Sequence, residues 1–366
     1  MLPLMLPLNW QRVRLGDIAE IVKGQQINKI SLNNTDKYPV INGGIDFLGY
    51  TNKFNVSKNT IAISEGGTCG YVRFMTSNFW SGGHNYSLQK ISNKVNNLCL
   101  YHILKSYEKD IMKLGVGSGL KNIQLKALKD FEILLPPLNE QIAIANILSA
   151  LDRYLCALDA LILKKEGVKK ALSFELLSQR KRLKGFNQAW QRVRLGDIAE
   201  IVKGQQINKI SLNNTDKYPV INGGIDFLGY TNKFNVSKNT IAISEGGTCG
   251  YVRFMTSNFW SGGHNYSLQK ISNKVNNLCL YHILKSYEKD IMKLGVGSGL
   301  KNIQLKALKD FEILLPPLNE QIAIANILSA LDNEIASLKN KKRQFENIKK
   351  ALNHDLMSAK IRVLKK

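Results

Sequence analysis

The sequence predicts an α+β protein in which two mixed α/β domains are joined by two long antiparallel coiled-coil helices, with pseudo-twofold symmetry. Three observations predict this fold class. Residues 10–152 recur letter for letter as residues 190–332. Short apolar runs punctuated by glycine fill each copy. A heptad pattern of apolar residues then follows each copy. We divide the chain into domain 1 (1–138), helix 1 (139–185), domain 2 (186–318) and helix 2 (319–366).

The repeat is too long to belong to a solenoid, because its 143 identical residues far exceed the roughly 20–50 residues of a solenoid unit. Each copy is long enough to enclose its own hydrophobic core. The copies stay in register beyond Asp152, since Lys169–Leu172 aligns with Lys349–Leu352.

Within the first copy, the pattern of short strands indicates a mixed or antiparallel sheet. Asn97 is expected to cap a helix at 98–114, whose apolar positions share one face. Polar composition predicts loops at 24–36 and 115–119. We expect strands at 11–14, 21–23, 38–41, 60–64, 71–75, 85–91 and 131–135, and a helical turn at 15–19.

A long helix is expected after Pro136 and Pro137, with Asn139 as its N-cap and Glu140 in its first turn, where a negative charge suits the helix dipole. The heptad stripe is narrow, which favours pairing of the two long helices over packing of each on its own domain. The predicted pairing residues are Ile144, Leu148, Leu151, Leu155, Leu158, Ile162, Ile324, Leu328, Leu331, Ile335, Leu338, Phe345 and Leu352.

Connectivity makes the helix pair antiparallel, because helix 1 leads from the first domain to the second and helix 2 runs back. We therefore expect a closed arrangement with an approximate twofold axis. Helices on the order of 40 residues would hold the domains about 60 Å apart at 1.5 Å per residue.

The charge of the chain indicates a polyanionic partner. The formal net charge is +23, with +5 in each identical copy, +6 in residues 153–189 and +7 in residues 333–366. Such a balance favours nucleic acid. For the two tails alone, docking on an acidic protein is an equally good interpretation.

The cysteines and the leader indicate a cytoplasmic protein. The five cysteines include no C-x-x-C pair, so zinc spacing is absent and reduced thiols are expected. Residues 1–8 are apolar but too short for a signal peptide, and they lack a basic start. No run of residues reaches the length needed to span a membrane.

No catalytic or metal centre is visible, so we expect the chain not to be an enzyme. The glycine-rich loop 115–122 lacks the glycine before lysine that a phosphate-binding loop requires. The Asn-Pro-Pro-Tyr type of motif that amino-methyltransferases use is absent. His84 and His102 have no partners at metal or triad spacing, which leaves structural or DNA-facing roles.

Polar residues of the predicted loops are candidates for DNA contact. Arg and Lys suit guanine, and Asn and Gln suit adenine, in the major groove, while glycines let a backbone approach phosphates. For the glycine pairs, tight turns are the alternative. The candidates in the first copy are Lys23, Gln25, Gln26, Asn28, Lys29, Asn42, Gly43, Gly44, Tyr71, Arg73, Trp80, His84, Asn85, Ser118, Lys121 and Asn122. Their counterparts are Lys203, Gln205, Gln206, Asn208, Lys209, Asn222, Gly223, Gly224, Tyr251, Arg253, Trp260, His264, Asn265, Ser298, Lys301 and Asn302.

Several segments together resemble the specificity subunit of type I restriction–modification systems, and the resemblance covers nearly the whole chain. The most specific segment is Ile133–Asp152, which leads through Pro-Pro-Leu-Asn-Glu-Gln into the long helix. The others are Leu15–Ile18 with Gly24, Ser64–Val72, and Gly117–Gly119 with Ile123, Leu125 and Leu128. All of them recur 180 residues later, and Ser358–Val363 resembles the end of the last helix in that family.

The resemblance implies that each domain is a target recognition domain that reads one half of a bipartite site in double-stranded DNA. It implies that the helices act as a ruler and dock methyltransferase subunits, two of them expected. Those subunits would bind S-adenosylmethionine and methylate adenine, and a translocating restriction subunit is a further candidate partner.

This chain departs from the family pattern in one respect, because family members usually carry two different recognition domains. Identical domains under a twofold axis must prefer an inverted repeat of one half-site. Two other classes of protein remain as alternatives. One is an interaction scaffold whose basic helices bind an acidic protein. The other is a nuclease fused to its reader, which is disfavoured because no acidic cluster with nuclease spacing stands out.

Overall fold

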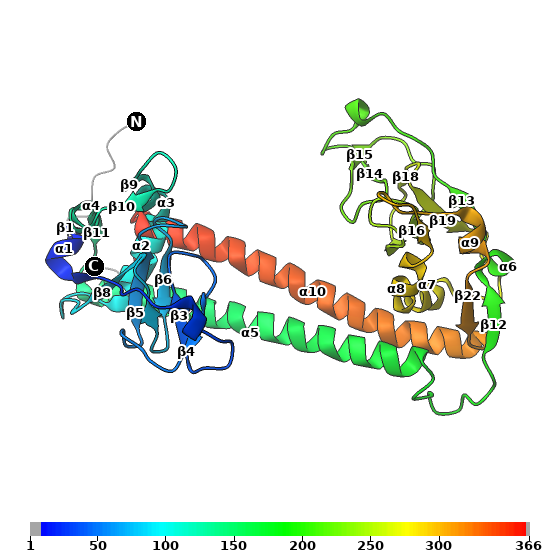
Figure 1. Cartoon of the computed structure of the whole chain (residues 1–366), viewed down its shortest axis with the longest axis horizontal. Coiled ribbons are helices and arrows are strands. Elements are labelled where there is room, and N and C mark those ends of the chain that lie inside the picture. The colour runs from blue at the N-terminus through cyan, green and yellow to red at the C-terminus, as the bar shows by residue number, and fades with distance from the viewer. Residues whose placement is uncertain (1–8, 364–366) are drawn as a thin grey trace. The chain divides into compact units, whose positions relative to one another are not determined.

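The computed structural model describes residues 9–363, and the expectation about the leader 1–8 lies outside them. The chain forms two compact units. Unit 1 runs to Asp159 and resumes at Asn340, and unit 2 is Ala160–Lys339. Each unit therefore combines one copy of the repeated domain with part of each long helix (Figure 1).

The first copy contains many short elements before the first long helix. In chain order they are β1 (Gln11–Arg14), α1 (Leu15–Ile18), β2 (Glu20–Lys23), the 3₁₀ helix η1 (Lys29–Ser31), β3 (Tyr38–Ile41), β4 (Gly49–Thr51), β5 (Thr60–Ser64), β6 (Val72–Met75), β7 (Trp80–Ser81), β8 (Asn85–Gln89), α2 (Asn97–Ser106), α3 (Glu108–Lys113), β9 (Gly115–Val116), β10 (Asn122–Ile123), α4 (Leu125–Lys129), β11 (Glu132–Leu135) and α5 (Leu138–Leu177).

The second copy repeats this order. Its elements are β12 (Gln191–Arg194), α6 (Leu195–Ile198), β13 (Glu200–Lys203), η2 (Lys209–Ser211), β14 (Tyr218–Ile221), β15 (Gly229–Thr231), β16 (Thr240–Ser244), β17 (Val252–Met255), β18 (Trp260–Ser261), β19 (Asn265–Gln269), α7 (Asn277–Ser286), α8 (Glu288–Met292), β20 (Gly295–Val296), β21 (Asn302–Ile303), α9 (Leu305–Lys309), β22 (Glu312–Leu315) and α10 (Leu318–Met357).

Each domain is built on an antiparallel sheet of order β2-β8-β5-β6 and a smaller mixed sheet of order β4-β3-β7. Successive side chains of strand β5 point to opposite faces of the sheet, and both faces are buried. Ile61 and Ile63 join the main core with α2, whereas Ala62 joins Ile41 and Phe79 in a small second core. The mixed α+β class predicted from the sequence is confirmed.

Several element boundaries differ from the expectation. The predicted helix 98–114 is two helices, α2 and α3, that meet at Tyr107. Its N-cap is Asn96, whose side chain accepts from the backbone N–H of Cys99, and not Asn97. The predicted loop 115–119 contains β9, which pairs with β10. The loop 24–36 contains η1, and strands β4 and β7 and helix α4 were not predicted.

Within each unit the two long helices lie side by side and run in opposite directions (Figure 1). In unit 1, Asp152 of α5 pairs with Lys349 of α10, and Asp159 pairs with the earlier Lys342 at 2.7 Å. In unit 2, Lys169 pairs with Asp332. The antiparallel arrangement therefore holds inside both units, whereas the twofold relation between the domains and their separation stay predictions.

The predicted pairing residues are all buried or half-buried. Ile144 and Leu148 enter the main core of their own domain, and Leu356 and Met357 from the end of α10 enter the same core. The start of α5 thus packs on its domain and on the partner helix together, so the two packing modes weighed from the sequence coexist there.

The helix seam diverges between the units where the copies cease to be identical. In unit 1 the rings of Tyr154 and Phe345 pack with centroids 4.6 Å apart. The positions 180 residues away are Glu334 and Lys165, which form an ion pair of 2.8 Å in unit 2. One position of the seam is therefore aromatic in unit 1 and ionic in unit 2.

A buried carboxylate joins each domain to the end of the other repeat's helix. Glu140, whose side chain is 3% exposed, accepts from Arg362 Nε at 2.7 Å and from Nη2 at 2.9 Å. It also accepts from Trp10 Nε1 at 3.2 Å. Glu320 has the same role in unit 2, with Arg182 and Trp190. We call these two clusters the Trp–Glu–Arg joints.

Gln141, the next residue, connects three segments of the domain. Its Nε2 donates to Pro136 O at 2.7 Å and to Lys94 O at 3.2 Å, and its Oε1 accepts from Asn96 N at 2.7 Å. The side chain is buried, so these bonds satisfy its polar atoms. The dipeptide Glu140–Gln141 therefore anchors the start of α5 in the domain.

No helix in residues 9–363 is long and apolar enough to cross a membrane.

Replacing Arg362 by alanine should destabilise unit 1 by about 3 kcal/mol, because it leaves Glu140 buried with only its tryptophan donor. Chemical denaturation followed by tryptophan fluorescence measures the loss. Arg12→Ala is the matched control, because it breaks an exposed pair with Glu132 and should cost less than about 1 kcal/mol. Equal losses of unfolding free energy in the two variants would mean that the Arg362–Glu140 pair stabilises unit 1 no more than an exposed ion pair does.

Candidate nucleic-acid interface

Five chain segments meet at one end of the four-stranded sheet in each domain. Backbone hydrogen bonds link Gly24 N to Asn85 O at 2.9 Å, and Glu65 N to His84 O at 2.9 Å. Others link Gly82 N to Ile41 O, Thr68 N to Gly43 O, and Ile123 N to Glu65 O, at 2.8, 2.8 and 2.9 Å. We call this region, formed by residues 23–26, 42–44, 65–68, 81–85 and 121–123, the convergent surface. Most predicted DNA-contact residues lie on it or next to it.

The glycines of the convergent surface let these segments touch one another. A Cβ on Gly24 would lie 2.1 Å from Gly82 O, and one on Gly43 would lie 2.5 Å from Gly66 O. Gly43 itself is buried at a φ of +82°, which favours glycine. Its carbonyl accepts from Thr68 N. The prediction that Gly43 contacts DNA does not fit this burial, and its role is close packing. Gly44 is half-buried.

Arg73 holds a loop in place and does not present a free guanidinium. Its Nη2 donates to Gly44 O and Ile45 O, both at 2.6 Å. Its guanidinium lies 5.1 Å from the ring centroid of Tyr71 and 5.7 Å from that of Phe47. Arg73 and Tyr71 are both half-buried. The same contacts occur at Arg253.

Other predicted contact residues are also occupied in the scaffold. Trp80 Nε1 donates to Gln25 O at 2.9 Å. Asn42 Oδ1 accepts from His84 N at 3.0 Å, and Asn28 Oδ1 accepts from Ile30 N at 3.1 Å. Asn85 is 1% exposed, so a direct DNA contact by its side chain does not fit the structure. The side chain of Asn122 lies over Gly66 but stays exposed.

A smaller set of candidates is left with exposed side chains. Within residues 9–363 these side chains in the first copy make no hydrogen bond or ion pair. They combine amide, imidazole, hydroxyl and ammonium groups, which can donate or accept at base edges and phosphates. They are Gln25, Gln26, Lys29, His84, Ser118, Lys121 and Asn122.

The buried carboxylate of Glu65 was missed from the sequence, although it lies under the convergent surface. Its Oε1 accepts from Lys23 Nζ at 2.7 Å and from Tyr86 Oη at 3.1 Å. Tyr86 also donates to Ile123 O at 2.9 Å. In the second copy, burial and the carboxylate of Glu245 raise the pKa of Tyr266 to about 12. Lys23 is half exposed, and the carboxylate of Glu65 partly neutralises its charge. In the sequence, the only signal for this pair is an acidic residue directly before two glycines, and its burial becomes visible only in the fold.

His102 lies outside the convergent surface, in the main body of the domain. It is 3% exposed on α2, and its Nε2 lies 3.9 Å from Asp152 Oδ2 on α5. Burial lowers the pKa of His102 to about 4, with a smaller lowering by Lys349 and a raising by Asp152. The neutral, buried ring fits the structural role and not the DNA-facing role that the sequence left open for His102.

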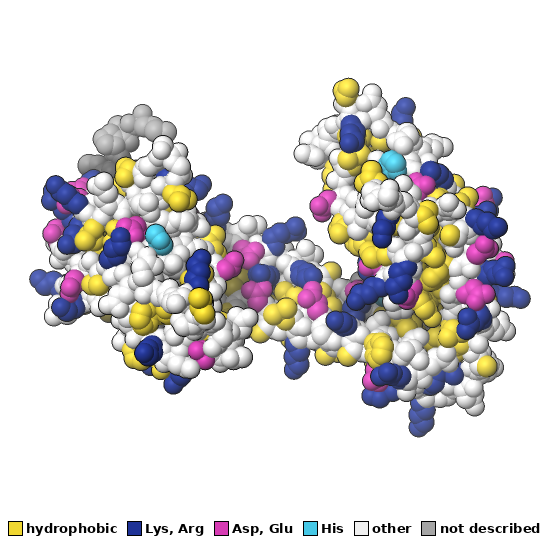
Figure 2. All heavy atoms as spheres, viewed as in Figure 1, with side chains coloured by type: hydrophobic (Ala, Val, Ile, Leu, Met, Phe, Trp, Pro, Cys, Tyr) yellow, Lys and Arg dark blue, Asp and Glu magenta, His cyan; other side chains and the backbone are white. Residues whose placement is uncertain are grey.

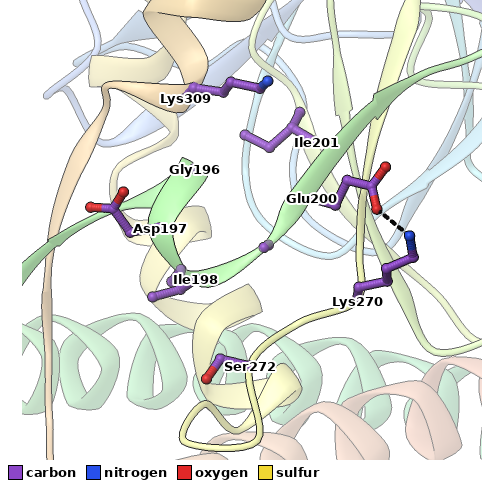
Figure 3. Close-up of a pocket in the computed structure, with 9 residues that line it drawn as sticks. Gly196, Asp197, Ile198, Glu200, Ile201, Lys270, Ser272 and Lys309 are labelled. Carbon is purple, nitrogen blue, oxygen red and sulfur yellow. Dashed lines mark ion pairs between the residues drawn. The ribbon is translucent and has the colours of Figure 1, made fainter.

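A hollow of about 370 Å³ in unit 2 lies at the other end of the sheet. Figure 3 shows its lining, where Glu200 and Lys270 form an ion pair of 2.8 Å. Glu200 begins β13, whereas Lys203 at the end of that strand belongs to the convergent surface. Among the described residues no group of His, Cys, Asp and Glu could hold a metal ion. Asp197, Ser272 and Lys309 also line the hollow.

Lys and Arg side chains are spread over the visible face of each unit, with Asp and Glu between them (Figure 2). On that face the positive charge does not gather into one patch. A net charge of +23 supplies a general attraction for polyanions.

Protonation of His102 and His282 should destabilise the protein in acid. A histidine whose folded pKa is about 4 stays neutral in the folded state while the unfolded chain takes up a proton below about 6.5. Each histidine should cost about 3 kcal/mol as pH falls from about 6.5 to about 4, and nothing above pH 7. Unfolding free energies measured across this range should lose part of their slope in His102→Asn. His354→Asn, at an exposed position, should keep the slope, and an unchanged slope in both variants would refute the assignment.

Replacing Gly24 and Gly204 by alanine should disrupt the convergent surface, because the new Cβ would meet backbone oxygen atoms at 2.1 Å and 2.5 Å. We expect a loss of about 2–3 kcal/mol in unfolding free energy. Gly119→Ala with Gly299→Ala is the control, since nothing lies within 4 Å of a Cβ there, and a change of at most about 0.5 kcal/mol is expected. A neutral result at Gly24 would mean that the segments are not closely packed.

Comparison with known proteins matches both copies of the repeat. A family model described as the type I restriction modification DNA specificity domain matches residues 7–165 and 187–347. A putative type I specificity subunit from Mycoplasma genitalium is 30% identical over 315 residues, 84% of this chain and 82% of the relative. A putative type I restriction enzyme specificity subunit from Methanocaldococcus jannaschii is 30% identical over 372 residues, 94% of this chain and 84% of the relative.

A solved structure shares the fold over nearly the full length. The crystal structure of the S subunit of a type I restriction–modification system from M. genitalium superposes with a TM-score of 0.81 at 27% identity. The superposition covers 97% of this chain and 99% of that chain.

Proposed function

Because this chain belongs to the type I restriction–modification DNA specificity family and is a subunit for DNA target recognition, we propose that each of its domains reads one half of a bipartite site in double-stranded DNA. The observation that carries this proposal is the convergent surface, which occurs once in each copy. Gln25 and Gln26 on this surface, with Lys29 in the loop that continues from it, support base reading, because amide and ammonium groups match adenine and guanine edges. Ser118 and Lys121 support contacts to the DNA backbone.

The two half-sites should have the same sequence, because residues 10–152 and 190–332 are identical. Opposed helices in each unit support a twofold arrangement, under which the target is an inverted repeat. The net charge of +23 supports a steep salt dependence, since each neutralised phosphate releases counterions.

Catalysis belongs, in this proposal, to partner subunits. The long helices dock two methyltransferase subunits, which bind S-adenosylmethionine and methylate adenine in the cytoplasm, and a translocating restriction subunit can join them. Exposed apolar residues on α5 outside the seam support docking on this helix. They are Leu161, Leu163, Val168 and Phe174.

An interaction scaffold that does not read bases is the alternative kept from the sequence. The basic tails support it, because they carry more than half of the net charge. The scaffold and the reader differ in one outcome, which is the dependence of the methylation pattern on the convergent surface.

The test maps methylated adenines genome-wide in cells that express the chain with its methyltransferase subunits. The unmodified chain should give an inverted repeat. Replacing Gln25 and Gln26 by alanine in the first copy alone should change one half of the motif and make it asymmetric, because the second copy still reads the original half-site.

Gln11→Ala is the matched control, since it also removes an exposed glutamine but lies on β1, away from the convergent surface. If the unmodified chain gave an asymmetric motif, the prediction that identical domains read identical half-sites would be wrong. A pattern that the Gln25 and Gln26 substitutions leave untouched would favour the scaffold.

A further inference from the structure

Two apolar side chains in each domain extend almost fully into solvent. Ile30 is 91% exposed and Leu120 is 81% exposed, and the copies Ile210 and Leu300 are 92% and 80% exposed. Among residues 9–363 these are the most exposed large apolar side chains. Single exposed apolar residues are common on protein surfaces, so their exposure alone has no significance. Their exposure is significant because each side chain lies at the end of a projection that hydrogen bonds or close packing hold in place.

Ile30 is held at the apex of an ordered turn. It is the middle residue of η1, and its N–H donates to Asn28 Oδ1 at 3.1 Å. Ser31 Oγ donates to Asn28 O at 2.7 Å, and Leu32 N donates to Lys29 O at 3.2 Å. The loop therefore uses several hydrogen bonds to fix an isoleucine that contributes nothing to a core.

The base of this loop is fixed to the smaller sheet. Asn33 and Tyr50 exchange backbone hydrogen bonds of 3.2 Å and 2.8 Å. Asn33 Oδ1 also accepts from Asp36 N at 2.7 Å, and Asn52 Nδ2 donates to Asp36 Oδ1 at 3.0 Å. These bonds tie the base of the loop to the smaller sheet.

Leu120 lies at the tip of the β9–β10 hairpin. The hairpin turns at Gly117, whose φ is +134°. Its base is tightly packed, because a Cβ on Gly115 would lie 2.5 Å from Cys69 Sγ. Asn122 Oδ1 would lie 2.2 Å from a Cβ on Gly66. Leu120 is thus also carried on a short and well-supported projection.

Both projections leave from the convergent surface, and a lysine stands beside each apolar tip. The loop of Ile30 begins at Gln25, whose N–H donates to Ser81 O at 2.8 Å. The hairpin of Leu120 ends at Ile123, whose N–H donates to Glu65 O at 2.9 Å. Lys29 and Lys121 are exposed neighbours of the two tips.

We propose that Ile30 and Leu120, with Ile210 and Leu300, are wedges that enter the DNA between adjacent base pairs and partly unstack them. This inference rests on the proposed function. Phosphates next to the lysines are charged and hydrated, whereas the stacked faces of the bases are the largest apolar surfaces of a duplex and would enclose these tips on two sides. Inserted Ile and Leu side chains unstack and kink DNA in this way. Because the cost of unstacking depends on the base step, the wedges add specificity for easily deformed pyrimidine–purine steps at positions where no hydrogen bond is made.

The test uses the full-length chain and a duplex that contains the site mapped by adenine methylation. A 2-aminopurine placed at successive positions reports unstacking, and end-labelled duplexes report bending by energy transfer. The unmodified chain should raise the 2-aminopurine fluorescence at a defined step and bend the duplex. Ile30→Ala with Ile210→Ala, and separately Leu120→Ala with Leu300→Ala, should each abolish the signal at one step. Each pair should weaken specific binding about tenfold.

A duplex with a mismatch at the identified step makes the test sharper. Its bases are already unstacked, so the unmodified chain should bind it more tightly than the matched duplex, whereas the alanine variants should bind both equally. Ile30→Leu should keep the preference, and Ile30→Asn should lose it. Leu138→Ala with Leu318→Ala is the control, because these exposed residues begin the long helices and their loss should change nothing.

Two different failures can be told apart. If the unmodified chain binds the mapped site specifically but without unstacking, and the alanine variants bind as tightly, the wedges are refuted and the proposed function stands. If the unmodified chain does not distinguish the mapped site from a scrambled duplex, the proposed function itself fails, and the wedges fail with it.

Discussion

The architecture depends on a buried carboxylate at the start of each long helix. Glu140 and Glu320 are almost completely removed from water. Each is stabilised by a tryptophan from the beginning of its own domain and by an arginine that follows the other long helix. A charge at such a depth requires its partners. The domain, the start of its helix and the end of the opposing helix therefore have to assemble together.

The helices between these joints tolerate more change than the joints do. The copies are identical to Asp152 and Asp332, and beyond that point the seam differs. The aromatic pair Tyr154–Phe345 in unit 1 corresponds to the ion pair Glu334–Lys165 in unit 2. This position of the helix seam holds either an aromatic pair or an ion pair, and both residues of the pair differ between the units. Lys169 and Lys349 correspond in the two tails, and each pairs with an aspartate of the identical part.

Much of the fold follows from the sequence because its signals are local or repeated. The exact duplication predicts two equal domains, and the heptads predict the paired helices that the structure contains. Prediction failed where tertiary contacts decide. The break at Tyr107 follows no proline or glycine, and strands as short as β4 and β7 show no alternation of apolar residues.

The candidate interface shows the same limit. The sequence identifies polar residues in loops, but not whether a distant segment has already engaged them. Arg73 matches the chemistry of a base reader, yet carbonyl groups 28 and 29 residues away occupy it. Glu65 resembles an ordinary acid in a turn, and only the fold reveals Lys23 and Tyr86 on its carboxylate. Gln25 and Gln26 keep exposed side chains because their turn faces solvent.

The Trp–Glu–Arg joints have a consequence for which parts of a domain can be replaced. The two residues that a domain contributes to its joint, Trp10 and Glu140 in the first copy, lie near its two ends, and the exposed candidate contact residues Gln25, Gln26 and Lys121 lie between them. Replacing residues between these two positions would change the exposed candidate contact residues and keep the hydrogen bond from Trp10 to Glu140. In a chain of this kind each domain can be replaced separately, and this chain carries the same domain twice.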